Sequence, residues 1–177
     1  MRRVREEGAI KNNLYLSDLE DRSIYIIREA YQAYRGRLAL LWSMGKDSTA
    51  LLHLARKAFF GDVPMPVVHI DTGRKFEEIY SFRAKISRAW RLNLVVARNE
   101  QALAGGMSPE KGRFNCCSTL KTQALRNAVS RQGYVALLVA IRRDEHSIRA
   151  KERYFSPRGY DFKWDYQSRA LELWAEY

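Results

Sequence analysis

The segment from residue 38 to residue 52 constrains the fold of this chain more than any other stretch of its sequence. The apolar run 38–42 predicts a buried strand, and a small polar loop, residues 43–48, leads directly into a helix-forming run. A strand, a tight turn and a helix N-terminus in this order direct backbone N–H groups and the helix dipole toward one point, which favours a bound anion such as phosphate. The loop adds hydroxyl groups, a glycine that permits close approach and a cation, from Ser43, Ser48, Gly45 and Lys46.

Strand-like and helix-like runs alternate along most of the sequence. Strands are predicted at 38–42, 67–70, 92–97 and 134–140, and helices at 48–60, 76–90 and 118–132. This alternation is typical of βαβ units. We therefore predict an α/β fold in which a parallel sheet lies between two layers of helices.

The two ends of the chain lack this pattern. We expect an irregular N-terminal arm over residues 1–16, followed by a helix that begins with a capping box at Ser17 and Glu20. The 177 residues are enough for one domain with a sizeable core, which we place at 17–160. After Ile141 the sequence becomes dense in charge, and we expect residues 161–177 to form a tail that packs on the domain.

The charge balance restricts the class of partner. The formal net charge of +11 favours an anionic partner such as a nucleotide, an oxyanion or a nucleic acid, although a basic surface that serves only solubility gives the same number. No apolar run approaches the ~20 residues of a membrane span, and no apolar segment of a secretory signal follows the basic N-terminus. The adjacent Cys116 and Cys117 are the only cysteines and cannot build a disulfide framework. We expect a cytoplasmic protein with no membrane contact.

Polar groups follow the predicted strands at their carboxyl ends. They are the 43–48 loop, the sequence Asp-Thr-Gly at 71–73 (the 71–73 loop) and the charged run Arg-Arg-Asp-Glu at 142–145. Ligands of open α/β sheets bind beyond the carboxyl ends of the strands, so we expect these groups to converge on one site. The 43–48 loop has neither the spacing of a Walker A motif nor the GxGxxG pattern of a dinucleotide fold.

The 43–48 loop, Ser-Met-Gly-Lys-Asp-Ser, resembles the SGGxDS loop of the PP-loop ATP pyrophosphatases, with Met44 in place of the first glycine. Three further blocks extend the resemblance: His-Ile-Asp-Thr-Gly-Arg-Lys-Phe at 69–76, Arg-Arg-Asp-Glu at 142–145 and Glu-Leu-Trp at 172–174. In this order they are similar to the small, catalytic subunits of bacterial ATP sulfurylases (sulfate adenylyltransferase subunit 2), relatives of the phosphoadenosine-phosphosulfate reductases. The resemblance implies an adenine nucleotide α-hydrolase-like fold and a nucleotidyltransferase.

The resemblance implies transfer of the adenylyl group of ATP to sulfate, release of pyrophosphate and a GTPase subunit as partner. Sulfate needs no deprotonation, so such an enzyme mainly aligns the reactants and spreads negative charge. Asp47 would orient the loop or bind Mg²⁺ through water. The residues implied on the pyrophosphate side are Ser43, Met44, Gly45, Lys46 and Ser48. Those implied on the nucleoside are Asp71, Thr72 and Gly73. Those implied on the sulfate and the α-phosphate are Arg142 and Arg143, and Arg149 is implied to close over the same site.

Two features depart from the sulfurylase pattern. Sulfurylase small subunits carry a further segment after the Glu-Leu-Trp block, so we expect the tail to be short relative to the family. The cysteine pair has no counterpart in the sulfurylases and resembles the pair of the related reductases. The reductases use a second pair for an iron–sulfur cluster or a later cysteine as nucleophile, and no cysteine follows Cys117 in this sequence. Reductase chemistry is therefore not expected.

Two other functions stay open. One is the insertion of sulfur into an RNA or DNA base, with Cys116 or Cys117 as sulfur carrier, because a helix N-terminus beside Arg113 favours a reactive thiolate. The other is a nucleotide-binding module without turnover.

Structural roles are the alternative for several of these residues. Asp71 also suits a helix cap, and the 142–145 run is also typical of a solvated surface. Cys116 and Cys117 also suit a helix start that faces the core. His69 lies inside a predicted strand, and we expect it to be a buried, hydrogen-bonded histidine rather than a ligand.

Overall fold

The computed structural model describes residues 2–145, 147, 149–159 and 162–165. The chain divides into two compact units, residues 1–140 and 141–177. This division falls inside the expected domain of residues 17–160, at the point where the sequence pattern changes after Ile141.

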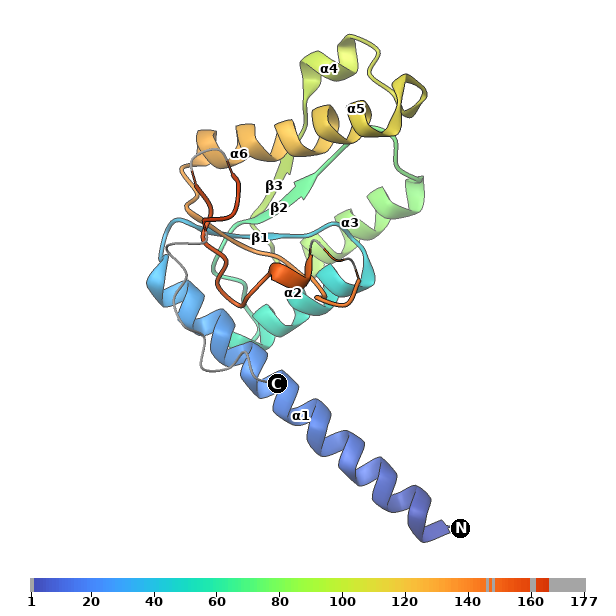
Figure 1. Ribbon diagram of the computed structural model, residues 1–177, viewed down its shortest axis with the longest axis vertical. Helices are drawn as coiled ribbons and strands as arrows, with labels where there is room; N and C mark the ends of the chain where they lie inside the picture. The colour runs from blue at the N-terminus through green and yellow to red at the C-terminus, as the bar shows by residue number, and fades with distance from the viewer. Residues whose placement is uncertain (1, 146, 148, 160–161, 166–177) are drawn as a thin grey trace. The chain divides into compact units, whose positions relative to one another are not determined.

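A four-stranded parallel sheet forms the centre of the first unit (Figure 1). Its strand order is β3-β2-β1-β4. The strands are β1 (Leu38–Leu41), β2 (Val67–Ile70), β3 (Leu94–Ala97) and β4 (Ala136–Leu138). In the register, Leu40 lies opposite Val67 and Leu38 lies opposite Ala136. The predicted parallel sheet is confirmed, with β3 and β4 shorter than the predicted runs.

Helices account for most of the remaining residues of this unit. They are α1 (Arg2–Ala33), α2 (Lys46–Ala58), α3 (Glu77–Ala89), α4 (Glu100–Ala104), α5 (Arg113–Cys117) and α6 (Ala124–Gln132). A short 3-10 turn, η1 (Pro109–Lys111), precedes α5, and a π-helical segment, η2 (Ser118–Gln123), connects α5 to α6 without a break. Within the described part of the chain, none of the helices combines the length and the apolar composition that a membrane span requires.

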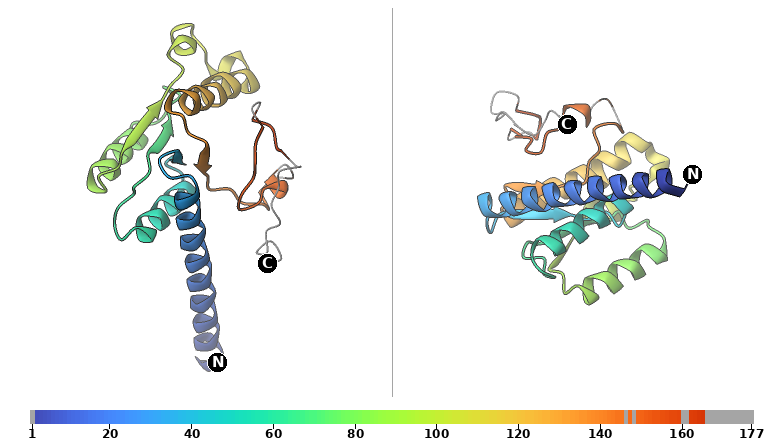
Figure 2. Two further views of the ribbon diagram at one scale, coloured as in Figure 1. Left: turned by 90° about the vertical axis from the view of Figure 1, so that its left-hand side faces the viewer. Right: turned by 90° about the horizontal axis from the view of Figure 1, so that it is seen from below.

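Alternate residues of the central strand bury opposite faces of the sheet. Ala39 belongs to a core with Val68, Ala97 and Tyr134, and residues 128–129 of α6 pack against it. Leu38 and Leu40 face the other way, toward the layer of α1 and α2, which pack on each other. Figures 1 and 2 show α6 on one side of the sheet and α1 and α2 on the other. The predicted three-layer α/β/α arrangement is confirmed.

Two expectations about helix starts are wrong. Helix α1 begins at Arg2, so residues 2–16 are helical rather than irregular and Ser17 caps nothing. This stretch consists largely of good helix formers, and a Ser-x-x-Glu pattern inside a helix does not start a new one. The helix predicted to begin at Ser118 instead begins at Arg113, directly after Gly112, whose φ of 94° is outside the helical range.

The second unit has little regular structure among its described residues. It contains the 3-10 turn η3 (Arg149–Lys151) and an antiparallel bridge between Arg158 and Trp164. The guanidinium of Arg158 lies 4.1 Å from the centroid of the Trp164 ring and pairs with Glu152 at 2.5 Å. Of the expected tail, only residues 162–165 are among the described residues, and the 172–174 block lies outside them.

Candidate functional site

The 43–48 loop joins β1 to α2 and is held together by its two serines. Ser43 Oγ and Ser48 Oγ lie 2.9 Å apart. Ser48 Oγ accepts a hydrogen bond from Ser43 N at 3.2 Å and donates one to Gly45 O at 3.0 Å. Gly45 O also accepts from Thr49 N at 2.9 Å, which begins the hydrogen bonding of α2. The predicted strand, tight turn and helix N-terminus therefore follow one another as expected.

Met44 and Gly45 give this loop its backbone geometry. Met44 has a φ of 66°, in the left-handed region that favours glycine, which explains why the SGGxDS pattern has glycine there. A side chain in this region is strained by about 1 kcal/mol. At Gly45, an added Cβ would lie 3.3 Å from Ser43 Oγ, inside the space that the serine network occupies.

Lys46 and Asp47 are the first two residues of α2, and both are exposed. Neither side chain has a hydrogen bond or an ion pair with another residue in the described part of the chain. Both lie where the N–H groups of the helix start have no intrahelical acceptor. The ammonium of Lys46 and these N–H groups together form an exposed set of anion donors at the end of β1.

Asp71, in the 71–73 loop, is in contrast buried, with hydrogen bonds to one carboxylate oxygen and an ion pair at the other. Its side chain follows β2 and is 5% exposed. Oδ1 accepts hydrogen bonds from Gly73 N at 2.8 Å and from Tyr80 Oη at 3.2 Å, and Oδ2 lies 3.5 Å from Arg83 Nη1. Burial alone would raise the pKa of Asp71, but these hydrogen bonds and the charges of Arg98 and Arg83 lower it. Asp71 does not cap α3, whose N-cap residue is Phe76.

Cations that the sequence did not single out surround Asp71. Arg98 follows β3, and its Nη2 lies 3.0 Å from the position that a Cβ on Gly73 would take. Arg83 comes from α3, and its guanidinium lies 5.1 Å from the centroid of the Tyr80 ring. Burial lowers the pKa of Lys75, Asp71 raises it, and the charges of Arg83 and Lys121 lower it further. The only sequence signal for Arg98 was its position directly after an apolar strand.

His69 is fully buried between the two loops, which confirms that it is a structural histidine rather than an exposed ligand. Its Nδ1 lies 3.0 Å from Trp42 O and its Nε2 lies 3.0 Å from Lys75 Nζ. Burial lowers its pKa to about 4, with smaller contributions from Lys75 and Arg83. The imidazole is therefore neutral at pH 7. An ammonium can only donate, so Nε2 accepts from Lys75 and Nδ1 carries the proton donated to Trp42 O.

The predicted arginines of the second unit all have partners within that unit. Arg142 donates to Asp144 with Nε at 3.1 Å and Nη2 at 2.6 Å. The Arg143 guanidinium lies 5.4 Å from the centroid of the Tyr154 ring, and Arg149 forms an ion pair with Glu145. The structure brings the first two loops together at adjacent strands of one sheet.

Cys116 and Cys117 are the last residues of α5 and precede the π-helical segment η2. Both thiols are free and half-buried. They lie inside a helix rather than at its first turn, so the expected helix N-terminus beside them is displaced to Gly112. Asn99, at the end of β3, donates through Nδ2 to Thr119 O at 3.1 Å and ties this helical run to the carboxyl edge of the sheet.

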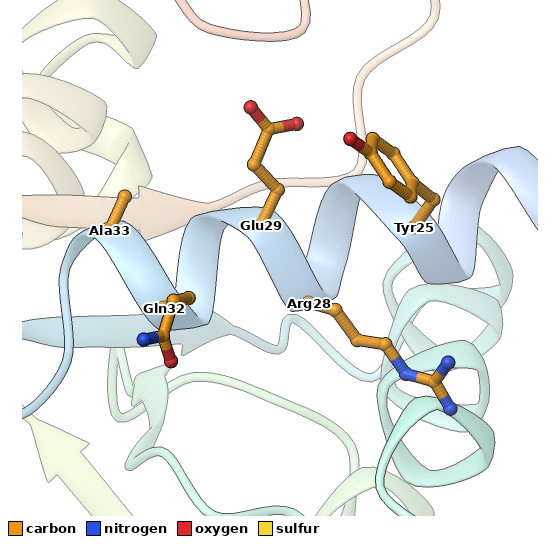
Figure 3. A pocket seen from close by; sticks show the side chains of 5 residues that line it. All are labelled: Tyr25, Arg28, Glu29, Gln32 and Ala33. Atoms are coloured by element: carbon orange, nitrogen blue, oxygen red, sulfur yellow. The ribbon is translucent and has the colours of Figure 1, made fainter.

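An open depression of about 480 Å³ lies along α1, lined by Tyr25, Arg28, Glu29, Gln32 and Ala33 (Figure 3). Arg28 holds its side chain toward α2, where Nε donates to Ala58 O at 2.8 Å. The depression contains none of the predicted site residues. Among the described residues, no group of three or more His, Cys, Asp or Glu side chains is placed to hold a metal ion.

Residues 37–164 match the phosphoadenosine phosphosulfate reductase domain family. The chain is 42% identical over 169 residues to sulfate adenylyltransferase subunit 2 of Yersinia enterocolitica, covering 94% of this chain and 56% of that protein. It is also 42% identical over 165 residues to the Zymomonas mobilis protein of the same name, covering 92% and 54%. The chain thus spans about half the length of the curated relatives that it matches.

The fold is shared with a solved reductase. The phosphate complex of phosphoadenylyl-sulfate reductase from Candida auris superposes with a TM-score of 0.56 at 20% identity, over 67% of this chain and 60% of that one. The family match extends from β1 to residue 164 and so includes the 43–48 loop, the 71–73 loop and the arginines of the second unit. This chain belongs to the phosphoadenosine phosphosulfate reductase domain family.

Proposed function

We propose that this protein is a nucleotidyltransferase that binds ATP and transfers its adenylyl group to sulfate. The observation that carries the proposal is the 43–48 loop, in which a closed serine network leaves Lys46 exposed and without a partner in the described part of the chain. Lys46 lies at a helix start whose first N–H groups have no intrahelical acceptor. Relatives named sulfate adenylyltransferase subunit 2, about 40% identical over more than nine-tenths of this chain, support the choice of sulfate as acceptor.

In the proposed reaction, a sulfate oxygen attacks the α-phosphorus of ATP and forms a new P–O bond. The bond to the oxygen that bridges the α- and β-phosphates breaks, and pyrophosphate leaves with the electron pair. Negative charge grows on the leaving oxygen, so donors fixed around it accelerate the step. Lys46 and the N–H groups of residues 46 and 47 would supply this stabilisation. The hydroxyls of Ser43 and Ser48, whose protons are used within the loop, would hold the loop in the shape that presents these donors to the pyrophosphate. No proton has to be removed from the acceptor.

The nucleoside would lie beside the 71–73 loop. Both oxygens of Asp71 are occupied by Gly73, Tyr80 and Arg83, so Asp71 would shape this loop rather than bind the base itself. Thr72, half-buried beside it, and the backbone of Gly73 would contact the nucleoside. The low exposure of Asp71 and the two hydrogen bonds to its Oδ1 support a preformed surface for this part of the ligand.

The sulfate and the α-phosphate would be held by Arg142 and Arg143, with Arg149 closing over them. Guanidinium groups match tetrahedral oxyanions because they donate two parallel hydrogen bonds. Each of these arginines has a partner within its own unit, Asp144, Tyr154 and Glu145 respectively. Binding of the dianion would therefore have to replace these contacts with hydrogen bonds to the ligand.

Mg²⁺ fits the donor set of the loop. Mg²⁺ commonly takes one or two carboxylates together with phosphate oxygens and water, and Asp47 offers one exposed carboxylate with no partner in the described part of the chain. Asp47 and the phosphates of ATP would hold the ion. When bound, Mg²⁺ would supply charge neutralisation for the departing pyrophosphate.

A partner subunit is part of the proposal, because the relatives are named as the second subunit of an enzyme. The partner proposed is a GTPase, and the proposed location is the cytoplasm. The net charge of +11 is in keeping with an anionic substrate and with an acidic partner surface.

The decisive experiment is the exchange of labelled pyrophosphate into ATP by the full chain, alone and with the partner GTPase, with and without sulfate. Sulfate-dependent exchange that is lost in Lys46→Met and kept in Lys85→Met, an exposed lysine of α3, supports the proposal. Exchange that requires RNA or DNA, and is lost in Cys116→Ala or Cys117→Ala, would replace it with sulfur insertion. Tight ATP binding without exchange under any condition would replace it with a nucleotide-binding module.

A further inference from the structure

The peptide unit between Trp42 and Ser43 is held at both of its polar atoms. Its carbonyl, Trp42 O, lies 3.0 Å from His69 Nδ1, and its N–H, on Ser43, donates to Ser48 Oγ at 3.2 Å. This peptide is the last of the β1 segment and the first of the 43–48 loop. A peptide fixed on both sides cannot rotate about its long axis without breaking one of these bonds. Its orientation decides where Ser43 Oγ and the loop amides point.

The bond to the carbonyl continues through His69 to the next loop. Lys75 donates to His69 Nε2 at 3.0 Å and to Ile70 O at 2.9 Å, so two of its three N–H groups are used inside the protein. Ile70 directly precedes Asp71, and Lys75 interacts electrostatically with Asp71. A series of hydrogen bonds therefore runs from Ile70, the residue before the 71–73 loop, through Lys75 and His69 to the first peptide of the 43–48 loop.

The burial of His69 separates it from any ligand. Its side chain is 0% exposed, beside Trp42 at 1%, so the imidazole contacts neither ATP nor solvent. Trp42 is itself fixed, since its indole Nε1 donates to Thr49 Oγ1 at 3.0 Å and its ring packs on Phe82 with centroids 6.0 Å apart.

We propose that His69 and Lys75 are positioning residues that couple the nucleoside side of the site to its pyrophosphate side. A ligand on the 71–73 loop fixes Lys75, Lys75 fixes the imidazole, and the imidazole fixes the Trp42–Ser43 peptide that begins the pyrophosphate cradle. The inference rests on the proposed function, because it takes the two loops as the two halves of one ATP site. We therefore expect adenosine and pyrophosphate, the two fragments of the ligand, each to tighten the binding of the other. A purely structural histidine would not produce this positive coupling.

The test measures pyrophosphate binding by calorimetry in the absence and in the presence of saturating adenosine, using the full chain. In the wild type, adenosine is expected to tighten pyrophosphate binding by about tenfold, a typical size for coupling between sites. In Lys75→Met the coupling is expected to fall below about twofold, while binding of pyrophosphate alone stays within about twofold of the wild type. Lys85→Met is the matched control and is expected to keep the full coupling.

Two variants of His69 separate its two bonds. The side-chain amide of Asn in His69→Asn replaces the donor to Trp42 O, so pyrophosphate binding is expected to persist and the coupling to be lost. The amide of Gln in His69→Gln lies where Nε2 was and leaves Trp42 O without its donor, so binding of pyrophosphate itself is expected to weaken by about tenfold, the equivalent of one hydrogen bond.

A measurement on the wild type alone keeps the inference testable if a variant does not fold. Adenosine is expected to shift the amide ¹H–¹⁵N resonance of Ser43, although it contacts only the other loop. Coupling that survives in both Lys75→Met and His69→Asn, or a Ser43 resonance that adenosine leaves unchanged, would overturn the inference while leaving the proposed function in place. A wild type that binds neither adenosine nor pyrophosphate would overturn the proposed function and the inference together.

Discussion

The loops that follow β1 and β2 lie at adjacent strands of one sheet but use their charges in opposite ways. In the 43–48 loop, neutral serine hydroxyls bond to one another and to the backbone, and the charged Lys46 and Asp47 are exposed with no partner in the described part of the chain. In the 71–73 loop, the charge of Asp71 is buried and occupied by Gly73, Tyr80 and Arg83.

This difference separates the residues that bind from the residues that position. An exposed, unpaired cation at a helix N-terminus loses nothing when an anion arrives, so its attraction is fully available to a ligand. A buried carboxylate surrounded by donors has already exchanged its hydration for protein contacts, and a ligand would have to displace them. We therefore expect substitutions in the first loop to affect activity and substitutions around Asp71 and His69 to affect stability.

Removing the cation of the first loop should have the largest effect. Lys46→Met is expected to lower sulfate-dependent pyrophosphate exchange by about 10²- to 10³-fold, the usual effect of deleting one donor to a developing negative charge. The urea midpoint of unfolding should stay within error of the wild type, because the side chain is exposed. A Lys46→Met enzyme that unfolds earlier in urea and exchanges pyrophosphate normally would reverse the assignment of roles.

The pH dependence of stability tests the buried histidine between the loops. Burial lowers the pKa of His69 from its ordinary 6.5 to about 4, so between these values the unfolded chain binds a proton that the folded chain does not. The free energy of unfolding should therefore fall as the pH is lowered from 6.5 to 4, by about 3 kcal/mol. Chemical denaturation at several pH values measures this slope.

The matched controls for this slope are two histidine variants. His69→Gln should lose most of the slope between pH 6.5 and 4, since the buried imidazole is its source. His53→Gln, which changes an exposed histidine of α2, should keep it. Equal slopes in all three proteins would show that the imidazole of residue 69 is not the group responsible.

A pair of aspartate variants compares the two loops directly. Asp71→Asn should lower the free energy of unfolding by about 2 kcal/mol, because it leaves Arg83, Arg98 and Lys75 without their common counter-charge. Asp47→Asn should change it by less than about 0.5 kcal/mol, because this carboxylate is exposed. Urea denaturation at pH 7 measures both.

The loss of stability in Asp71→Asn should also depend on pH. Because its neighbours lower the pKa of Asp71, the stability from this carboxylate is present above its ordinary value of 3.8 and is lost as the pH falls through its folded value. Asp71→Asn lacks this component, so its deficit relative to the wild type should shrink in acid. A difference in the free energy of unfolding that is the same at pH 7 and pH 3 would show that the carboxylate of Asp71 is not the source of this stability.

The smallest expected effect concerns the backbone of the first loop. Met44→Gly should stabilise the protein by about 1 kcal/mol or leave it unchanged, because relief of a left-handed φ of 66° opposes the greater freedom of glycine in the unfolded chain. Thermal unfolding measures it, with Met44→Ala as the control that keeps the strain. A clear loss of stability in Met44→Gly would mean that the methionine side chain, rather than the backbone, matters at this position.

The sequence predicted the sheet and the first loop well because both depend on the succession of apolar and polar residues along short stretches of the chain. Apolar runs such as 67–70 alternate with helical runs at a spacing that only a parallel sheet accommodates, and the run 43–48 lies between a strand and a helix whatever the rest of the chain does. Helix ends were predicted less well. Residues 2–16 have helix-forming composition but no start signal, and Gly112 was not recognised as the residue before a helix.

The partners of Asp71 could not be predicted, because they depend on contacts between segments far apart in the chain. Arg83 comes from α3 and Arg98 follows β3, and nothing in the local pattern brings either to residue 71. The bond from His69 to Trp42 joins residues of different strands for the same reason. The sequence indicated which residues end strands, whereas the packing of the sheet decides which of their charges are neutralised and which stay free.

The most direct test of the central claim is a titration of the full chain with pyrophosphate, followed by amide ¹H–¹⁵N resonances. We predict that the largest shifts fall on residues 43–48, with Gly45 and Lys46 foremost, and that Lys46→Met abolishes them at the same concentration. Shifts centred on another element, such as the depression along α1, with residues 43–48 unchanged, would contradict the claim that this loop binds the pyrophosphate of ATP.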